Sequence, residues 1–413
     1  MNLGLLTEGV KIPRKKFAAI LLLNSGTLAW FFSLLTYFPV VSEAIALDPS
    51  WSNIGPAILF GSAIFWSILG SFIGGKVNRR NLLIFSIALG LFSTILVALF
   101  QVTMSVTVSG FLMGMSFGLG LPSSMALIAD YTVVEERARV SGIIVLLTFV
   151  LAFAAMVTVR MLNLEQNVFG ICLLLALLRS VGFLAFGFDK CKGPEQTATE
   201  KTRLPSSAYR QFALYLLPWL MFAIISSLAW NLISMDKFAE GVATGTMYRY
   251  VFIAVFSLVS GAIADRYGRK QPIFIGLVVL GISFALLGFF GITETNVIIY
   301  LALSGVAWGS FFVLFLAVPG DLSGVGSREK FYGLGYILPI AVMLGFSLIP
   351  GESILVGQSA SLVAQIFSAV LFLSIIPILR AKETLPETKR RDRELGEHLK
   401  KVGKIIQETK EDT

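Results

Sequence analysis

The stretch Gly261-Ala-Ile-Ala-Asp-Arg-Tyr-Gly-Arg-Lys-Gln-Pro-Ile-Phe274 is a short charged turn between two long apolar runs. Residues 252–264 before it are almost wholly apolar, and residues 272–291 after it carry no charge. A helix needs about 20 residues to cross the hydrocarbon core of a membrane, so both runs are candidate membrane spans. The charges from Asp265 to Lys270 are strongly disfavoured in lipid, so the turn is expected at a membrane surface.

The composition agrees with this interpretation. The chain has 413 residues, of which 56% are hydrophobic and only 14% are charged, which indicates a polytopic membrane protein. Two cysteines, Cys172 and Cys191, provide no disulfide framework, and the single histidine, His398, lies in a polar tail. These scarcities argue against a His/Cys metal site, and we expect neither a metal nor a cofactor.

Alternate loops between the apolar runs carry the basic residues. Nearly all of the 33 Lys and Arg residues fall in the N-terminal segment, in every second loop and in the C-terminal tail. This asymmetry is typical of cytoplasmic loops, so both termini are expected in the cytoplasm. It also explains the net charge of +8 without a nucleic-acid partner. The expected spans are residues 17–41, 52–75, 82–101, 106–129, 140–159, 168–188, 211–234, 246–264, 272–291, 297–318, 333–350 and 361–379.

The two halves of the chain share motifs in the same order. The pattern D-x6-R-x-[RK]-x2-G at residues 130–142 recurs at residues 321–333, and the basic loop at residues 76–80 matches residues 266–270. The pattern G-x3-G at residues 114–118 recurs at residues 305–309 with the same spacing, and such glycines let helices approach closely. Duplicated halves are common in transporters, whose binding sites lie between the repeats.

A polar segment separates these halves. Residues 189–210 form the longest internal break and have the composition of a linker. We therefore predict an N-terminal six-helix bundle over residues 1–188 and a C-terminal six-helix bundle over residues 211–379. Residues 380–413 form a charged tail, which is either a short basic amphipathic helix on the inner leaflet or a disordered segment.

The pattern G-x3-D-R-x-G-R-K at residues 261–270 resembles the signature loop of the major facilitator superfamily of secondary transporters. The D-x6-R-x4-G element resembles the loop after the fourth helix of the same family. The resemblance implies an all-α membrane protein with twelve transmembrane helices in two pseudo-symmetric six-helix bundles, located in the plasma or inner membrane. It implies a permease and not an enzyme: a secondary active or facilitative transporter of a small organic solute, working by rocker-switch alternating access.

The charged loops are expected to control the conformation. In the resembled family, the Asp of the loop pairs with an Arg and faces a helix N-terminus in the other half. By resemblance, Asp265 caps the start of the fifth span near residues 140–142, with Arg328 as ion partner. The first-half loop has Gly75 in place of this Asp, so the restraint is expected to be one-sided; alternatively, the charges only fix topology. The candidate gating residues are Asp265, Arg266, Gly268, Arg269, Asp130, Arg137, Asp321, Arg328 and Arg79.

Polar and aromatic side chains within the spans are candidates for substrate contact, with hydrogen bonding between helices as the competing interpretation. Arg179 lies near the middle of a span, where a charge is by default a functional hypothesis; the alternative is a side chain that reaches the interface. Arg249 lies near the outer end of the eighth span, where it recruits an anion or belongs to the interfacial aromatic belt. The other candidates are Asn24, Thr27, Trp30, Ser227, Trp230, Asn231, Trp308 and Tyr336.

The substrate class follows from charge. No acidic residue falls inside an expected span, which disfavours proton symport through a buried carboxylate. The two arginines favour an organic anion as substrate. The alternatives are an exporter of hydrophobic compounds, suggested by the aromatic-rich spans, and a non-transporting membrane sensor. The expected partners are a small-molecule substrate, the lipid bilayer and an unidentified coupling ion, and the chain is expected to be a monomer.

Overall fold

The computed structural model describes residues 11–45, 54–74, 77–192, 206–233, 238–324, 326–347 and 359–386, and all regular structure in these ranges is helical. The predicted tail helix lies outside these ranges, as do most of the predicted linker and the side chain of Asn231. The α-helices are α2 (Arg14–Ile45), α4 (Ile54–Ile73), α5 (Arg79–Leu99), α6 (Thr103–Tyr131), α7 (Val134–Met161), α8 (Val168–Phe188), α9 (Ser206–Ile233), α10 (Ala239–Tyr267), α11 (Lys270–Phe290), α12 (Glu294–Leu322), α13 (Arg328–Ser347), α15 (Ala360–Leu373) and α16 (Ile375–Arg380), with a 3-10 turn η1 (Leu164–Gln166).

Within the described residues, 11 helices are long and apolar enough to cross a membrane, α15 and α16 together forming one of them. They correspond to eleven of the twelve expected spans. The expected span 333–350 corresponds to α13, which is helical but is not among those 11.

Short polar residues and glycines set the helix boundaries. Asn78, Asn167, Thr293 and Ser359 each accept a hydrogen bond from a backbone N–H in the first turn of the helix that follows. Gly268 ends α10 with φ +114°, a conformation that favours glycine. Because the connection from α10 to α11 is so short, these two helices run antiparallel.

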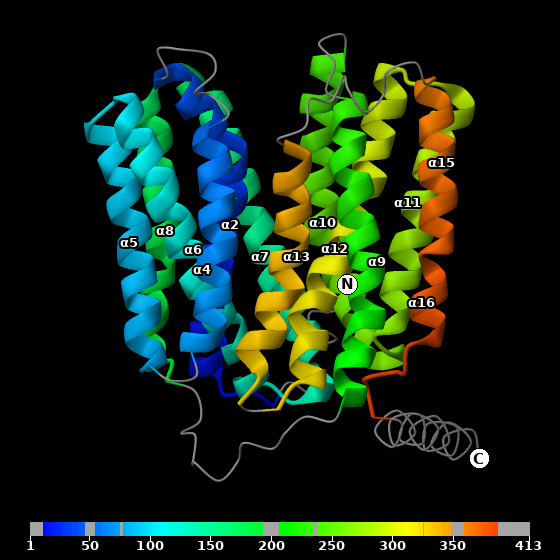
Figure 1. Cartoon of the computed structure of the whole chain (residues 1–413), viewed down its shortest axis with the longest axis horizontal. Helices are drawn as coiled ribbons and strands as arrows, with labels where there is room; N and C mark the ends of the chain where they lie inside the picture. The colour runs from blue at the N-terminus through cyan, green and yellow to red at the C-terminus, as the bar shows by residue number, and fades with distance from the viewer. Residues whose placement is uncertain are drawn as a thin grey trace, which may run out of the picture.

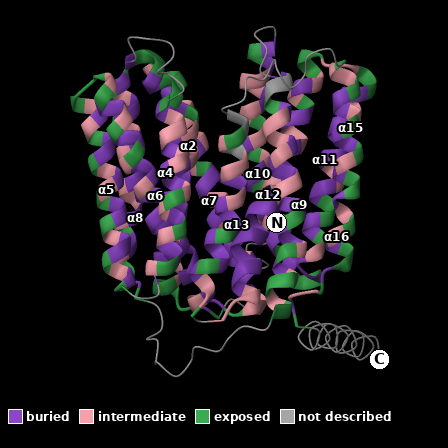
Figure 2. Ribbon diagram, in the orientation of Figure 1, coloured by how far each residue is buried: buried purple, intermediate pink, exposed green. Residues whose placement is uncertain are grey.

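The helices fall into two sets in space, as Figure 1 shows. We call α2 to α8 the N-terminal helices and α9 to α16 the C-terminal helices. In each set the tightest packing is between equivalent helices, α4 with α6 and α10 with α12. The sets meet mainly where α7 packs against α10 and where α4 packs against α13. Burial follows this arrangement: α6 and α12 are the most buried of the candidate spans (Figure 2).

The repeated glycines lie where helices approach closely, as predicted. A Cβ at Gly118 of α6 would lie 2.6 Å from the carbonyl oxygen of Ala63 on α4, and a Cβ at Gly309 of α12 would lie 2.9 Å from that of Ile253 on α10. Backbone atoms cannot move aside as a flexible side chain can. These glycines therefore serve helix packing within each set.

A second group of glycines allows the two sets to touch. A Cβ at Gly142 of α7 would lie 2.6 Å from the carbonyl oxygen of Ser257 on α10, and a Cβ at Gly261 of α10 would lie 2.6 Å from that of Ala138 on α7. Gly333, the repeat counterpart of Gly142, lies in the same way against the Ser71 hydroxyl between α13 and α4. The glycine of the repeated motif thus marks the two places where the sets cross.

We predict that Gly142→Ala destabilises the contact between the two sets of helices. The added methyl meets a backbone carbonyl, and overpacking of this kind destabilises a fold by at least about 1 kcal/mol. The thermal unfolding midpoint of the purified protein is expected to fall. Gly61→Ala on α4 is the matched control, because its Cβ meets nothing within 4 Å. Equal midpoints for the two variants would contradict the prediction.

Candidate functional site

Charged side chains of both sets meet at one end of the helices, which we call the charged end. It is formed where α4, α6, α10 and α12 end and where α5, α7, α11 and α13 begin. Their side chains are only 0–15% exposed, so these charges depend on one another and not on water. The residues of the charged end are Arg79, Asp130, Arg137, Arg139, Asp265, Arg269, Asp321, Arg328 and Glu329.

Asp321, at the end of α12, joins the two sets. Its carboxylate accepts a hydrogen bond from Arg269 Nε at 2.8 Å and another from Arg137 Nη1 at 2.6 Å. Arg269 belongs to the C-terminal helices, and Arg137 belongs to the N-terminal helices. Burial by itself would lower the pKa of the Arg269 guanidinium, but Asp321 and Asp265 outweigh this effect and raise that pKa above its usual range. Arg269 therefore stays charged.

Asp130, at the end of α6, forms the same arrangement in the other half. It pairs with Arg79 of its own set and with Arg328 of the C-terminal helices. The aspartate and the arginine of one repeated D-x6-R motif do not pair with each other. Instead, each loop arginine crosses to the aspartate of the other half. Both pairs therefore connect the two sets.

Asp265 lies against the first turns of α7. Its carboxylate accepts hydrogen bonds from the backbone N–H groups of Ala138 and Arg139, at 3.2 and 2.9 Å, and forms ion pairs with Arg139 and with Arg269. The expected contact with the start of the fifth span is therefore present, two residues before the predicted site at residues 140–142. The favourable partners are donors near the positive end of the helix dipole. Arg328 was suggested as the ion partner of Asp265; it pairs with Asp130 instead, because α13 begins beside α6.

The other residues of the signature loop have separate roles. The Arg266 side chain is exposed and lies over the ring of Tyr267, 5.4 Å from its centroid. A Cβ at Gly268 would collide with the carboxylate of Glu383, which accepts a hydrogen bond from the backbone N–H of Arg269 at 2.7 Å. Because Gly268 has no side chain, Glu383, in the segment after the last span, can bind the backbone at the start of α11.

Sequence reasoning did not identify Glu329, although it is 2% exposed and pairs with Arg79 across the two sets. A signal was available in the repeat. With residues 130–142 aligned on 321–333, Glu329 occupies the position of Ala138, so an acid is present in one copy only.

The substrate candidates on α2 point into the N-terminal helices. Asn24 donates to the carbonyl oxygen of Ser124 on α6 at 3.2 Å, and Thr27 accepts from Arg179 on α8 at 3.0 Å. Trp30 is fully buried beneath the same guanidinium, 4.5 Å from its ring centroid. The face of α2 that meets the C-terminal helices is a different one. It carries Phe32 and Thr36, which contact Phe312 and Tyr250.

Arg179 is 1% exposed, and its guanidinium does not reach the surface. It donates to Thr27 of α2, to Ser116 Oγ of α6 at 2.8 Å and to the carbonyl oxygen of Ser86 of α5 at 3.0 Å. No ion pair is formed by Arg179 with any described residue. Its hydrogen-bonding contacts all belong to the N-terminal helices, so one side chain of α8 joins three further helices of that set.

The candidates on α9 and α10 lie at the opposite end of the helices. Trp230 is 43% exposed, and the Arg249 guanidinium lies 5.9 Å from its ring centroid. Ser227, one turn earlier on α9, is half-buried. The structure therefore places Arg249 and Trp230 together, as a cation over an aromatic ring.

Aromatic rings of both sets meet in the middle of the molecule. Phe149 of α7 lies 5.6 Å from Phe312 of α12 and 5.4 Å from Tyr250 of α10, and Phe32 lies 5.1 Å from Phe312, measured between ring centroids. Trp308 extends this group toward α9, where it packs against Phe222 at 4.6 Å. We call Phe32, Phe149, Tyr250, Trp308 and Phe312 the aromatic junction.

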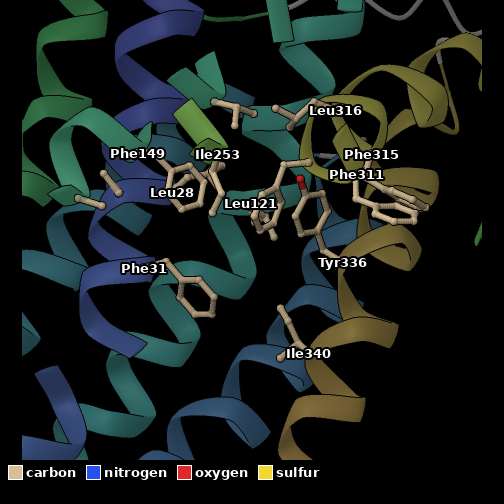
Figure 3. Close-up of a cluster of buried hydrophobic side chains, with 14 of the residues drawn as sticks. Leu28, Phe31, Leu121, Phe149, Ile253, Phe311, Phe315, Leu316, Tyr336 and Ile340 are labelled. Atoms are coloured by element: carbon tan, nitrogen blue, oxygen red, sulfur yellow. The ribbon is translucent and has the colours of Figure 1, made fainter. Parts of the chain in front are cut away.

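Tyr336 of α13 lies near the aromatic junction among apolar side chains of both sets, including Leu121, Phe311 and Phe315 (Figure 3). The residue is 6% exposed, and its hydroxyl has no hydrogen-bond partner among the described residues. A buried hydroxyl is normally paired, because leaving it unpaired destabilises a protein by about 1–3 kcal/mol. Tyr336 thus places a hydroxyl without a described partner at the contact between the sets.

We predict that Asp265→Asn opens the charged end. The amide keeps the shape of the carboxylate but loses its charge, and hydrogen bonds to charged groups contribute about 1.5–3 kcal/mol each. Maleimide labelling of a cysteine at Ser71, which is buried between α4 and α13, is expected to become at least about tenfold faster. Asp189→Asn is the control, because Asp189 binds Tyr131 within the N-terminal helices. Equal labelling rates would contradict the prediction.

Part of the chain matches a known family. Residues 5–156 match the family model of the Major Facilitator Superfamily. An uncharacterized MFS-type transporter of Methanocaldococcus jannaschii is 33% identical over 133 residues. This match covers 32% of this chain and 33% of the length of that relative.

Solved structures share the fold over nearly the whole chain. The human organic anion transporter MFSD10 (TETRAN) gives a TM-score of 0.65 at 15% identity, covering 88% of this chain and 99% of that one. The proton:xylose symporter XylE gives 0.64 at 14% identity, covering 90% and 96%. A bacterial homologue of the iron transporter ferroportin, in an outward-facing state, gives 0.68 at 14% identity, covering 89% and 98%. The chain is therefore similar to the major facilitator superfamily: residues 5–156 match its family model, and the fold resembles that of a solved member, the proton:xylose symporter XylE.

Proposed function

We propose that this chain is a secondary transporter that moves a small organic solute across a cell membrane by alternating access. The two sets of helices act as two six-helix bundles, and the charged end and both termini face the cytoplasm. The observation that carries this proposal is the distribution of polar contacts between the sets. Among the described residues, the buried ion pairs that join the sets all lie at the charged end.

Away from the charged end, the described residues join the sets by polar contacts without ion pairs. These include Thr36 with Tyr250 at 3.5 Å and Arg160 with the sulfur of Met247 at 3.1 Å. Thr36 and Arg160 are exposed. A molecule held at one end and loosely joined at the other corresponds to one state of an alternating-access cycle, closed toward the cytoplasm. The outward-facing state named for the ferroportin homologue, which has the same fold, supports this assignment.

A reversible crosslink tests the mechanism. The Lys330 ammonium of α13 lies 5.3 Å from the ring centroid of Phe72 on α4, so cysteines at these positions bridge the two sets at the charged end. In a Cys172→Ser/Cys191→Ser background, we expect a reducible methanethiosulfonate crosslinker to stop solute flux in proteoliposomes, and reduction to restore it. The rigid-body motion cannot occur while the end is held closed.

The matched control pair lies within one set. The Lys16 ammonium of α2 lies 4.8 Å from the ring centroid of Tyr131 on α6. Crosslinking cysteines at these two positions leaves the sets free to move, so flux is expected to continue. Undiminished flux with the bridge between Phe72 and Lys330 closed would rule out alternating access of this kind.

The aromatic junction supports an apolar solute as substrate. Aromatic faces bind flat apolar groups, and each aromatic pair adds about 0.5–1.5 kcal/mol beyond the buried area. The unpartnered Tyr336 hydroxyl adds one hydrogen-bonding group. Among the described residues, no acidic side chain forms an ion pair or hydrogen bond with the aromatic junction, and Arg179 makes its contacts inside the N-terminal helices. The best-supported solute is a neutral aromatic compound with one hydrogen-bonding group.

An organic anion is the second candidate. It is favoured by one observation, the Arg249 guanidinium beside the exposed Trp230. A cation over a ring at the open end of the molecule is suited to attract a carboxylate that carries an aromatic group.

Three naphthalene compounds of matched shape separate these candidates: neutral 2-naphthol, anionic 2-naphthoate and cationic 2-naphthylmethylamine. For a neutral substrate we expect 2-naphthol to bind best, and Tyr336→Phe to weaken its binding by about fivefold, the equivalent of one hydrogen bond. Phe290→Ala, an exposed residue at the end of α11, is the control and is expected to change nothing. Preferred binding of 2-naphthoate that is lost in Arg249→Gln would instead establish the anion.

A further inference from the structure

The two signature loops of this chain differ in one acidic residue. The second loop carries Asp265, whereas the first loop has Gly75 at the matching position. From sequence alone the first loop therefore lacks the acid that its arginine needs. The structure nevertheless leaves Arg79 with two carboxylate partners, Asp130 and Glu329.

We propose that Glu329 supplies the missing acid of the first loop from the opposite set of helices, and that it is a gating residue of the transport cycle. The gating role of Glu329 rests on the proposed function, whereas its ion pair with Arg79 does not depend on it. Arg79 and Arg269 are counterparts in the repeat, and each binds the aspartate at the end of a neighbouring helix. The second carboxylate of Arg269 comes from its own set, through Asp265, and that of Arg79 comes from across the interface.

Charge balance supports this assignment. Arg79 and Arg328 share the single carboxylate of Asp130, so without Glu329 two buried guanidinium groups would face one acid. An uncompensated charge in such a place is strongly destabilising. With Glu329 the cluster has two cations and two anions. The other cluster carries one cation more, because Arg137, Arg139 and Arg269 face Asp265 and Asp321.

Packing supports it as well. Gly74, which precedes the substituted position, has so little space that a Cβ there would lie 3.2 Å from Cγ of Glu329. The stem of Glu329 therefore lies directly against the first loop. The acid that pairs with Arg79 is thus carried by the first turn of α13 and not by the first loop.

The relocation has a mechanical consequence. When the charged end opens, the pairs of Arg79 with Glu329 and of Arg328 with Asp130 must both break, because each joins the two sets. Arg79 and Asp130 then remain together on the N-terminal helices, and Arg328 and Glu329 remain together on α13. Each set keeps one cation and one anion, so neither is left with a net charge from this cluster. Glu329 thus restrains the closed state without leaving an unpaired charge in the open one.

Electron-spin distance measurements on the purified full-length protein test the proposal. Spin labels at Asn81→Cys and Gln271→Cys, both exposed at the charged end on different sets, report the separation of the sets after Cys172 and Cys191 are replaced by serine. For Glu329→Gln we expect the ratio of open to closed populations to rise at least about tenfold, because a buried ion pair loses one partner. An unchanged distance distribution would overturn the proposal.

Two further variants show whether the effect belongs to the position of the acid. Glu136→Gln is the matched control: Glu136 is 1% exposed at the start of α7, and its carboxylate binds the backbone N–H groups of Lys11 and Val133. It is expected to leave the distances unchanged. Adding Gly75→Asp to Glu329→Gln returns the acid to the first loop, and we expect it to restore the closed population. Failure of this restoration would overturn the claim that Glu329 replaces the loop acid.

The readout also separates this inference from the proposed function. Distances are measured without any solute, so a shift with Glu329→Gln supports the inference even where no compound in a panel is transported. Conversely, transport without a shift in the distances would show that Glu329 is not a gating residue, while the proposed function as a transporter would stand. If Glu329→Gln does not fold, Glu329→Asp keeps the charge on a shorter stem, and a smaller shift in the same direction is expected.

Discussion

Buried arginine–carboxylate pairs between the two sets of helices are the interaction on which the rest of this structure depends. The side chains of Asp130, Asp265 and Asp321 are at most 1% exposed, so water does not share in solvating them. In such surroundings a charge is stable only with its partner, and removing one partner leaves the other in an unfavourable state. The network therefore behaves as a unit, either closed and dry or open and hydrated. This two-state behaviour is what the proposed gate requires.

The two sets are held together in the middle of the molecule by contacts of a different kind. Phe149 and Phe312 meet through ring contacts, which have no fixed partner and can be replaced by a flat apolar solute. The aromatic junction can thus separate without breaking an ion pair, whereas the charged end cannot. The glycines at the crossings, such as Gly142 against the carbonyl of Ser257, bring the backbones close enough for the ion pairs to form. Directional contacts at one end and non-directional contacts in the middle suit a motion that pivots about a binding site.

Arg179 shows that a buried charge can serve to join helices. Its place near the middle of an apolar run made it a candidate for anion binding. Its hydrogen bonds to Thr27, Ser116 and the Ser86 carbonyl instead join four helices of one set. Helical periodicity shows which residues share a face of a helix, but it does not show which neighbour that face meets. The same reason explains why Asn24 and Trp30 turn into the N-terminal helices while Phe32 meets the C-terminal ones.

The chain by itself determined the helices, the charged turns between them and the repeated motifs, because apolar length, charge and short-range spacing are local properties. The glycine contacts followed from those patterns, and the contact of Asp265 with the start of α7 was implied by the family resemblance. Only the tertiary structure decided which acid meets which arginine. Arg328 pairs with Asp130. Glu329 pairs with Arg79, which lies 250 residues earlier in the chain, and replaces an acid that the loop of Arg79 lacks. Ion pairing depends on distance in space, and that distance exists only after the two sets of helices have packed together.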